Sequence, residues 1–198
     1  MKERPILFSG PMVRAILGGS KTVTRRALNA QSLKLINYGA QVGECHYLPE
    51  DGKVHQNSAG YYADFCPYGL PGDRLWVRET YADAGCRLTY RADTDDGAHC
   101  KVKKWTPAIH MFRKDSRILL EITAVRVERL QDISEEQALA EGVRGEPCDH
   151  ARQACSDIGC WGDTAKGAFG FLWEQLNGAG AWQANPWVWV IEFKRVTP

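Results

Sequence analysis

The sequence predicts an α+β fold, because strand patterns and helix patterns follow one another without regular alternation. Apolar or alternating runs typical of strands lie at 5–8, 74–80, 117–130 and 187–193. Helical periodicity with start and stop residues appears at 9–18, 134–141 and 169–176. With 198 residues the chain can bury a sizeable core, so we expect one domain over 1–198 with long loops at about 27–70 and 144–166.

The N-terminal segment joins a short strand to a helix and then presents a basic cluster. Pro11 suits the first turn of the helix, where its missing N–H is not needed, and Gly18 and Gly19 end it. The residues that follow are Lys21, Thr22, Val23, Thr24, Arg25 and Arg26.

Positive charge is concentrated near the start of the chain, although the total is close to neutral. Residues 1–40 contain seven Lys or Arg and one acid, against 25 and 24 in the whole chain. This split indicates a local anionic ligand rather than a surface coated by nucleic acid. A solvated basic edge strand is the alternative that charge alone leaves open.

The middle of the chain is expected to contain a long loop and several strands. Residues 27–70 show no sustained periodicity, so we expect mostly loop with one short strand near 33–36. In the strand at 74–80, Glu79 shares a face with Leu75 and Val77, which directs it toward the core or the strand end. Further strands are expected at 87–92 and 111–114.

The helix after the long strand at 117–130 has clear boundary signals. Ser134 and Gln137 form a capping box, and Gly142 ends the helix. Glu141 lies in the last turn, where the helix dipole disfavours an anion by about 0.3–1 kcal/mol. A residue placed against its local preference is a candidate for a functional role.

The C-terminal part contains another helix and the most apolar strand. An apolar stripe predicts the helix over 169–176 and consists of Phe169, Leu172, Trp173 and Leu176. Residues 187–193 are apolar on both faces until Glu192, which predicts a buried central strand.

Four potential zinc ligands lie in the loop at 144–166, namely Cys148, His150, Cys155 and Cys160. Their spacing lacks a Cys-x-x-Cys knuckle, so we expect no cofactor, and a structural zinc stays the open alternative to free cysteines. The seven cysteines form no secreted framework, which predicts a reducing, cytoplasmic location. No apolar run approaches membrane-spanning length, so we expect neither a signal peptide nor a membrane partner.

Five short motifs follow one another along the chain: Gly18–Arg26, Pro71–Glu79, the strand that ends in Val127–Leu130, Ile133–Gly142 and Trp187–Phe193. Their order resembles the ASCH family, a branch of the PUA-like β-barrels, and especially its phage and prophage members. The likeness spans most of the chain but not the two long loops. It implies a mixed β-barrel with helices at the barrel mouth and a cleft for RNA or a modified nucleoside.

The resemblance also implies a site. Some small ASCH proteins are amidohydrolases that remove the acetyl group from N4-acetylcytidine, and their Lys-x-x-Thr motif and late-helix Glu fall on Lys21, Thr24 and Glu141. Others are ribonucleases. Because binding phosphate and positioning catalytic groups use the same residue types, a ribonuclease acting on single-stranded RNA and a non-catalytic RNA-binding module stay open.

Cleaving an acyl–nitrogen bond needs a nucleophile, a base and a proton donor. Burial and the neighbouring arginines are expected to lower the pKa of Lys21 from about 10.4, so that it can take a proton from Thr24 or water. Glu141 would orient the lysine or carry the proton to the leaving nitrogen. Residues three apart in a regular strand face opposite ways, so Lys21 and Thr24 converge only if the backbone turns between them.

The candidate substrate-binding residues are Arg25, Arg26, Glu79, Trp76 and Tyr68. The two arginines alternate in direction, so one is expected to contact a substrate phosphate or carbonyl while the other pairs with an acid. Trp76 and Tyr68 offer rings on which a base can stack, and a place in the core is the alternative for Trp76. The oligomeric state stays open.

Overall fold

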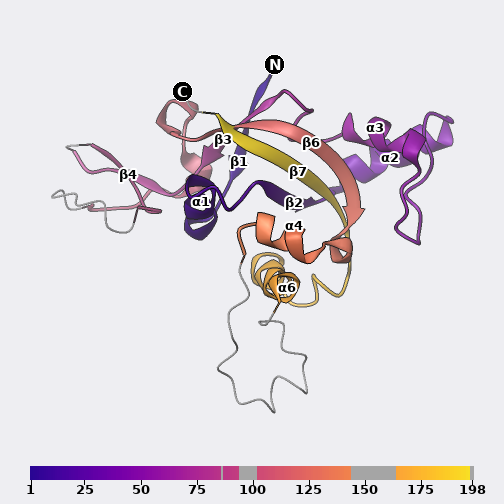
Figure 1. Ribbon diagram of the computed structural model, residues 1–198. Helices are drawn as coiled ribbons and strands as arrows, with labels where there is room; N and C mark the ends of the chain where they lie inside the picture. The colour runs from indigo at the N-terminus through magenta and orange to yellow at the C-terminus, as the bar shows by residue number, and fades with distance from the viewer. Residues whose placement is uncertain (86, 94–101, 144–163, 197–198) are drawn as a thin grey trace, which may run out of the picture.

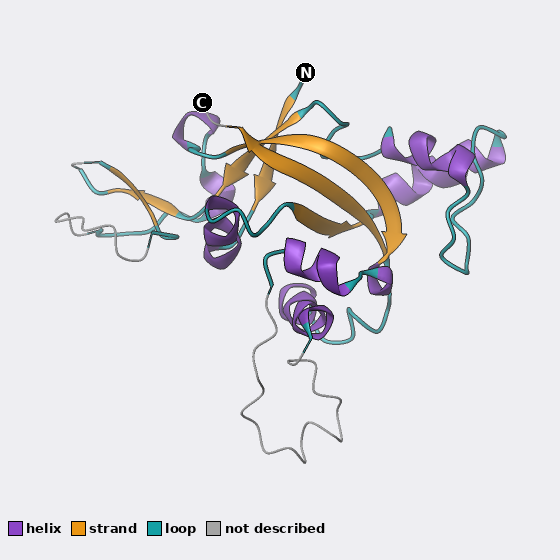
Figure 2. Cartoon of the chain, viewed as in Figure 1, coloured by secondary structure: helices purple, strands orange, loops and turns teal. Residues whose placement is uncertain are grey.

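The computed structural model describes residues 1–85, 87–93, 102–143 and 164–196, and its centre is one mixed sheet (Figures 1 and 2). The strand order is β1-β3-β6-β7-β2, with β1 parallel to β3 and the other neighbours antiparallel. The strands are β1 (Glu3–Leu7), β2 (Val23–Ala27), β3 (Arg74–Arg78), β6 (Leu119–Arg129) and β7 (Trp187–Val196). The predicted α+β class is therefore confirmed.

The sheet is open, which corrects the expectation of a closed barrel. A barrel needs its first and last strands to pair, but β1 and β2 occupy opposite edges of the sheet order, and no ladder joins them in the described residues. Figure 1 shows that β6 and β7 are long and strongly curved. Their register shifts between Ile122 and Ala124, an irregularity of the kind that bends a strand pair without closing the sheet.

Helix α1 (Gly10–Leu17) connects the two edge strands, as the sequence predicts. Val13 and Ile16 are its buried residues, and Pro11 lies in its first turn. Gly19 follows with a φ of 76°, a conformation that glycine adopts without strain.

The prediction that residues 27–70 are mostly loop is wrong. The segment contains two helices, α2 (Ala30–Gln41) and α3 (Gln56–Ala63). Asn29 caps α2 by accepting a hydrogen bond from the backbone N–H of Ser32. The buried positions of α2 are Ser32, Ile36 and Gly39, which follow helical spacing although only Ile36 is a large apolar residue. Gly39 allows close packing, since a Cβ there would lie 2.6 Å from the Tyr61 ring.

The next segment holds a two-stranded hairpin, β4 (Tyr81–Asp83) with β5 (Leu88–Tyr90). The strand predicted at 111–114 is wrong. Two 3-10 turns occupy this region, η1 (Ala108–His110) and η2 (Arg113–Asp115), closed by short-range bonds such as that from the Asp115 N–H to the Phe112 carbonyl. Phe112 is exposed and Met111 is fully buried, so only one side chain of this apolar-looking stretch anchors it.

Two short helical elements and one longer helix cover one face of the curved sheet (Figure 1). They are η3 (Leu130–Asp132), α4 (Glu135–Ala140) and α6 (Ala165–Asn177). The predicted capping box of Ser134 and Gln137 is present, and the Glu135 carboxylate accepts from the Ala165 N–H at the start of α6. These helices pack on β2 and β7 through a cluster that includes Val23, Phe169, Trp173, Val188 and Val190.

The opposite face of the sheet carries the larger apolar cluster, which includes Ile6, Leu75, Leu120, Trp189 and Ile191. Because its alternating residues enter both clusters, β7 is buried on both faces, as the sequence predicts. Within the described residues, every helix falls short of the length and apolar character needed to cross a bilayer.

Candidate active site

A buried ion pair joins Lys21 to Glu141, which lie 120 positions apart. The Lys21 ammonium donates to the Glu141 carboxylate at 2.7 Å and to the backbone carbonyls of Glu141 and Val23, each at 2.9 Å. The side chains are 0% and 3% exposed. An ammonium has three donors, so this set satisfies all of them.

The local backbone explains how two distant residues meet. After Gly19, the N–H groups of Ser20 and Lys21 both donate to the Ala15 carbonyl, which keeps Lys21 out of a regular strand. Lys21 and Glu141 then form an isolated β-bridge, and β2 begins only at Val23. Glu141 is the C-cap of α4, so the helix end delivers its carboxylate directly to the amine.

Arg25 holds the other side of the Glu141 carboxylate. Its guanidinium contacts Glu141 at 3.5 Å, Glu128 at 3.2 Å and the Gln137 side-chain oxygen at 2.7 Å. That Gln137 oxygen also accepts from the Ser134 N–H, so the capping residue ties α4 to β2. The prediction that one of the two arginines pairs with an acid is confirmed for Arg25.

Burial lowers the pKa of the Lys21 ammonium from its ordinary value of 10.5. Glu141 opposes this shift, and the positive charges of Arg26 and Arg25 add to it. The direction and both causes of the pKa shift agree with the sequence-based expectation, and desolvation is the largest cause. A lysine in this setting releases its proton more readily than an exposed one.

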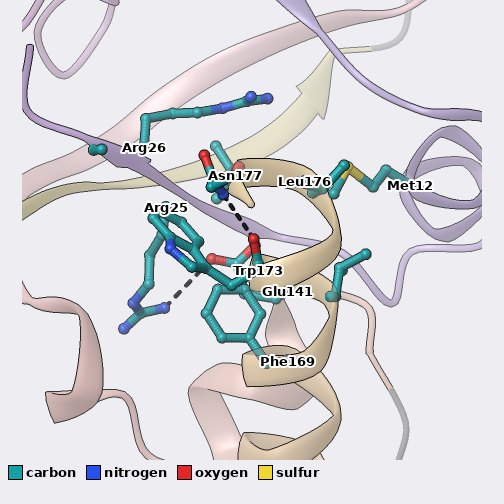
Figure 3. Close-up of a pocket in the computed structure, with 11 residues that line it drawn as sticks. Met12, Arg25, Arg26, Glu141, Phe169, Trp173, Leu176 and Asn177 are labelled. Atoms are coloured by element: carbon teal, nitrogen blue, oxygen red, sulfur yellow. Dashed lines mark hydrogen bonds and ion pairs between the residues drawn. The ribbon is translucent and has the colours of Figure 1, made fainter. Parts of the chain in front are cut away.

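Arg26 is directed away from Glu141 (Figure 3). It donates to the Leu7 carbonyl at 2.6 Å, and its guanidinium lies 5.3 Å from the centre of the Phe8 ring. The Lys21 amine lies 5.5 Å from the same ring. Phe8 therefore covers the Lys21 amine on the side of the larger apolar cluster, to which Phe8 belongs.

A pocket of about 210 Å³ opens between β2 and α6, beside the ion pair (Figure 3). Its polar side is formed by Thr24, Arg25, Arg26 and Glu141. Its apolar side is formed by Met12 from α1 and by residues of α6, namely Phe169, Leu172, Trp173 and Leu176. The pocket therefore places an apolar wall opposite a nucleophile candidate and an acid.

Thr24 lines this pocket, but it is not bonded to Lys21, because the ammonium is fully occupied by Val23 and Glu141. Glu141 touches the amine and also lines the pocket. It is thus the group that connects Lys21 to any molecule bound beside Thr24.

Three other predicted substrate-binding residues lie outside the lining of this pocket. Both Glu79 oxygens accept from Arg117, at 2.9 and 3.0 Å, and burial raises the pKa of Glu79. Trp76 is 8% exposed and lies under the Arg78 guanidinium, while Tyr68 packs against the larger apolar cluster. Their contacts are those of structural residues, and contact with a substrate stays a prediction for them.

The candidate zinc ligands Cys148, His150, Cys155 and Cys160 lie outside the described residues. In the part of the chain that the structure describes, no group of three or more His, Cys, Asp and Glu side chains is arranged to hold a metal.

Sequence reasoning missed the wall that α6 contributes. The sequence predicts a helix from the stripe of Phe169, Leu172, Trp173 and Leu176 but no pocket wall, and the first and third of these residues are buried. Leu176 is 57% exposed, so the stripe runs out of the core and along the pocket. The signal for the wall is an apolar helix stripe that continues past the residues that are buried in the core.

No family model matches the chain, and no curated protein matches it. Among solved structures, the chain is similar to a crystal structure of an ASCH domain from Lactobacillus crispatus, at 12% identity and a TM-score of 0.38. The alignment covers 98% of this chain and 79% of the other.

Proposed function

We propose that this protein is an ASCH-type amidohydrolase that cleaves the acyl–nitrogen bond of N4-acetylcytidine. The observation that carries the proposal is the buried Lys21–Glu141 pair, whose carboxylate lines a pocket together with Thr24. The order of sequence motifs, which assigns these three residues one by one, supports the same activity. Cytidine and acetate are the expected products.

The site contains the groups that this reaction needs. The attacking hydroxyl, from Thr24 or from water, gives its proton to Glu141 as its oxygen bonds to the acyl carbon. When the carbon–nitrogen bond breaks, Glu141 gives this proton to the departing amine, because Glu141 lines the pocket and Lys21 does not. The Lys21 ammonium holds the carboxylate in position over a 2.7 Å hydrogen bond, and the pair ends with its original charges. If Thr24 attacks first, water then hydrolyses the acyl-threonine and releases acetate.

The test is incubation of the purified protein with N4-acetylcytidine, followed by chromatography of cytidine and acetate. We expect turnover by the wild type, none by Lys21→Met, and an unchanged rate for Lys194→Met, a control whose side chain is 62% exposed. Thermal unfolding of each variant shows whether it folds. A folded wild type without turnover, or a Lys21→Met variant as active as the wild type, refutes the proposal.

A further inference from the structure

Trp173 carries a hydrogen-bond donor that has no partner within the described residues. Its indole N–H is buried and unpaired, and the residue is only 5% exposed. Trp173 lines the pocket beside the ion pair, and Figure 3 shows its ring reaching from α6 toward the side that holds Arg25 and Glu141. Burying an N–H without an acceptor costs about 1–3 kcal/mol, and buried tryptophans usually find a partner.

The ring of Trp173 is held in place by its own helix. Phe169 packs against it with ring centres 6.1 Å apart, and Asn177 donates to the Trp173 backbone carbonyl at 3.0 Å. The indole N–H therefore has a defined direction before any ligand arrives. The lining residues Arg25 and Arg26 each add a buried Nε–H without a partner in the described residues. Residues that line the pocket thus carry three buried donors without a partner in the described residues.

Size and chemistry limit what can fill this pocket. Its volume of about 210 Å³ lies below the roughly 300–1,000 Å³ of sites for drug-sized ligands, so it suits a single base. The apolar wall formed by Leu172, Leu176 and Met12 suits the face of a flat ring. An acceptor on the edge of that ring would satisfy one of the unpaired donors.

We propose that Trp173 binds a pyrimidine base by donating its indole N–H to the carbonyl oxygen of the ring. The identity of the base as cytosine rests on the proposed function. With the acyl end directed at Thr24 and Glu141, the ring carbonyl is the acceptor farther from the acyl group, beyond the ring nitrogen N3, and it is the one that we assign to the donor on α6. Trp173 is then the residue that orients the base, and the helix α6 is the recognition element of the site.

The test is calorimetric binding of cytidine, which needs no turnover. Trp173→Phe is compared with Trp189→Phe, because Trp189 also carries a buried, unpaired indole N–H but does not line the pocket. Losing one hydrogen bond weakens binding by about 3- to 10-fold, so we expect this loss for Trp173→Phe and no change for Trp189→Phe. The melting temperatures of both variants show how much stability each loses when the indole is replaced by a smaller ring.

A ligand-side change separates a lost hydrogen bond from a packing effect. In 2-thiocytidine the ring oxygen is replaced by sulfur, a weak acceptor. The wild type is expected to bind it more weakly than cytidine, while Trp173→Phe binds the two alike. The inference is overturned if the change from cytidine to 2-thiocytidine weakens binding equally in the wild type and in Trp173→Phe. It is also overturned if Trp173→Phe binds cytidine with wild-type affinity.

The outcome is independent of catalysis. If cytidine binds in the Trp173-dependent way but N4-acetylcytidine is not hydrolysed, the inference stands and the amidohydrolase proposal fails. If N4-acetylcytidine is hydrolysed and Trp173→Phe binds cytidine like the wild type, the proposal stands and the inference fails. If the wild type does not bind cytidine, the inference fails whatever the turnover.

Discussion

Lys21 and Glu141 are joined through both backbone and side chain. Their backbones form an isolated β-bridge, and the Lys21 ammonium binds the Glu141 carboxylate at 2.7 Å and the Glu141 carbonyl at 2.9 Å. The carboxylate is therefore fixed relative to the amine. The same contacts lock the end of α4 to the start of β2, so the pair has a structural as well as a chemical role.

Removing Glu141 is expected to cost more stability than removing Lys21. Glu141→Gln leaves the charges of both Lys21 and Arg25 without this acid, whereas Lys21→Met leaves Glu141 with Arg25 at 3.5 Å. Breaking a buried pair from one side costs about 3–5 kcal/mol, and we expect Glu141→Gln to lie in this range and Lys21→Met below it. Urea unfolding at pH 7 measures both.

The double variant Lys21→Met/Glu141→Gln is the control for this asymmetry. Because each change removes a charge that the other leaves unpaired, its loss is expected to be smaller than the sum of the single losses by about 0.5–3 kcal/mol. Additive losses, or a larger cost for Lys21→Met, contradict the buried pair as described.

The stability that Lys21 contributes is expected to increase with pH. Burial lowers the pKa of this lysine from 10.5, so between the folded value and 10.5 the unfolded chain binds more protons than the folded protein. Stability rises with pH wherever the unfolded state binds more protons. The difference in unfolding free energy between the wild type and Lys21→Met should therefore grow across this window and level off near 10.5.

Other groups titrate in the same range with the opposite sign, which is why the comparison uses a difference. Burial raises the pKa values of the Cys66 thiol and of the Tyr62 and Tyr90 hydroxyls. The folded protein then keeps protons that the unfolded chain loses, so these groups destabilise at high pH in both proteins. Urea titrations from pH 7 to 10.5 give the difference, and a value that falls with pH contradicts the lowered lysine pKa.

Local signals in the sequence predicted the elements that build the ion pair. The capping box at Ser134 and Gln137 and the glycine at 142 defined α4, and the position of Glu141 against the helix dipole marked it as unusual. The approach of Lys21 to Glu141 was expected only from the resemblance to a family. Local periodicity cannot predict a contact between two charged residues that lie 120 positions apart.

Other features depend on packing that no local pattern encodes. The inner face of α2 uses Ser32 and Gly39 where a helix pattern expects apolar side chains, because Ser32 donates to the Phe65 carbonyl and Tyr61 packs against Gly39. An open sheet and a closed barrel can use the same strands, and only the pairing at β1 and β2 distinguishes them. The wall that α6 forms along the pocket likewise depends on the packing of this helix opposite β2.

Thr24 can be tested as the nucleophile with two nearly isosteric changes. It is 3% exposed and lines the pocket, so Thr24→Val keeps the shape and removes only the hydroxyl. We expect Thr24→Val to lower kcat on N4-acetylcytidine by roughly 10²–10⁴-fold, the range for losing a reacting group that exchanges a proton. Thr24→Ser keeps a hydroxyl and should stay within about tenfold of the wild type.

The result for Thr24→Val also decides between the two attacking groups. If water attacks directly, Thr24→Val retains most of the wild-type kcat. If Thr24 attacks, an acyl-enzyme forms, and quenched reactions of the wild type should show an added acetyl mass that Thr24→Val lacks. Mass spectrometry of the intact protein detects it.

Gly142 is expected to be essential for placing the ion pair. It has a φ of 83°, and a Cβ there would lie 2.7 Å from the Ala15 Cβ and 3.1 Å from the Lys21 Cβ. Gly142→Ala therefore bears the left-handed backbone cost of about 1–2 kcal/mol and a packing cost of about 1–3 kcal/mol. Relief of the clash moves Lys21 or the end of α4, so kcat should fall by roughly 100-fold, as for a catalytic group misplaced by about 1 Å.

Gly19→Ala is the matched control for this prediction. Gly19 has a similar φ of 76°, but a Cβ there meets no atom within 4 Å. It bears only the backbone cost, so urea unfolding should show a smaller loss than for Gly142→Ala, and kcat should stay near that of the wild type. Equal stability losses for the two variants, or equal rates, would show that the space beside Lys21 does not control its position.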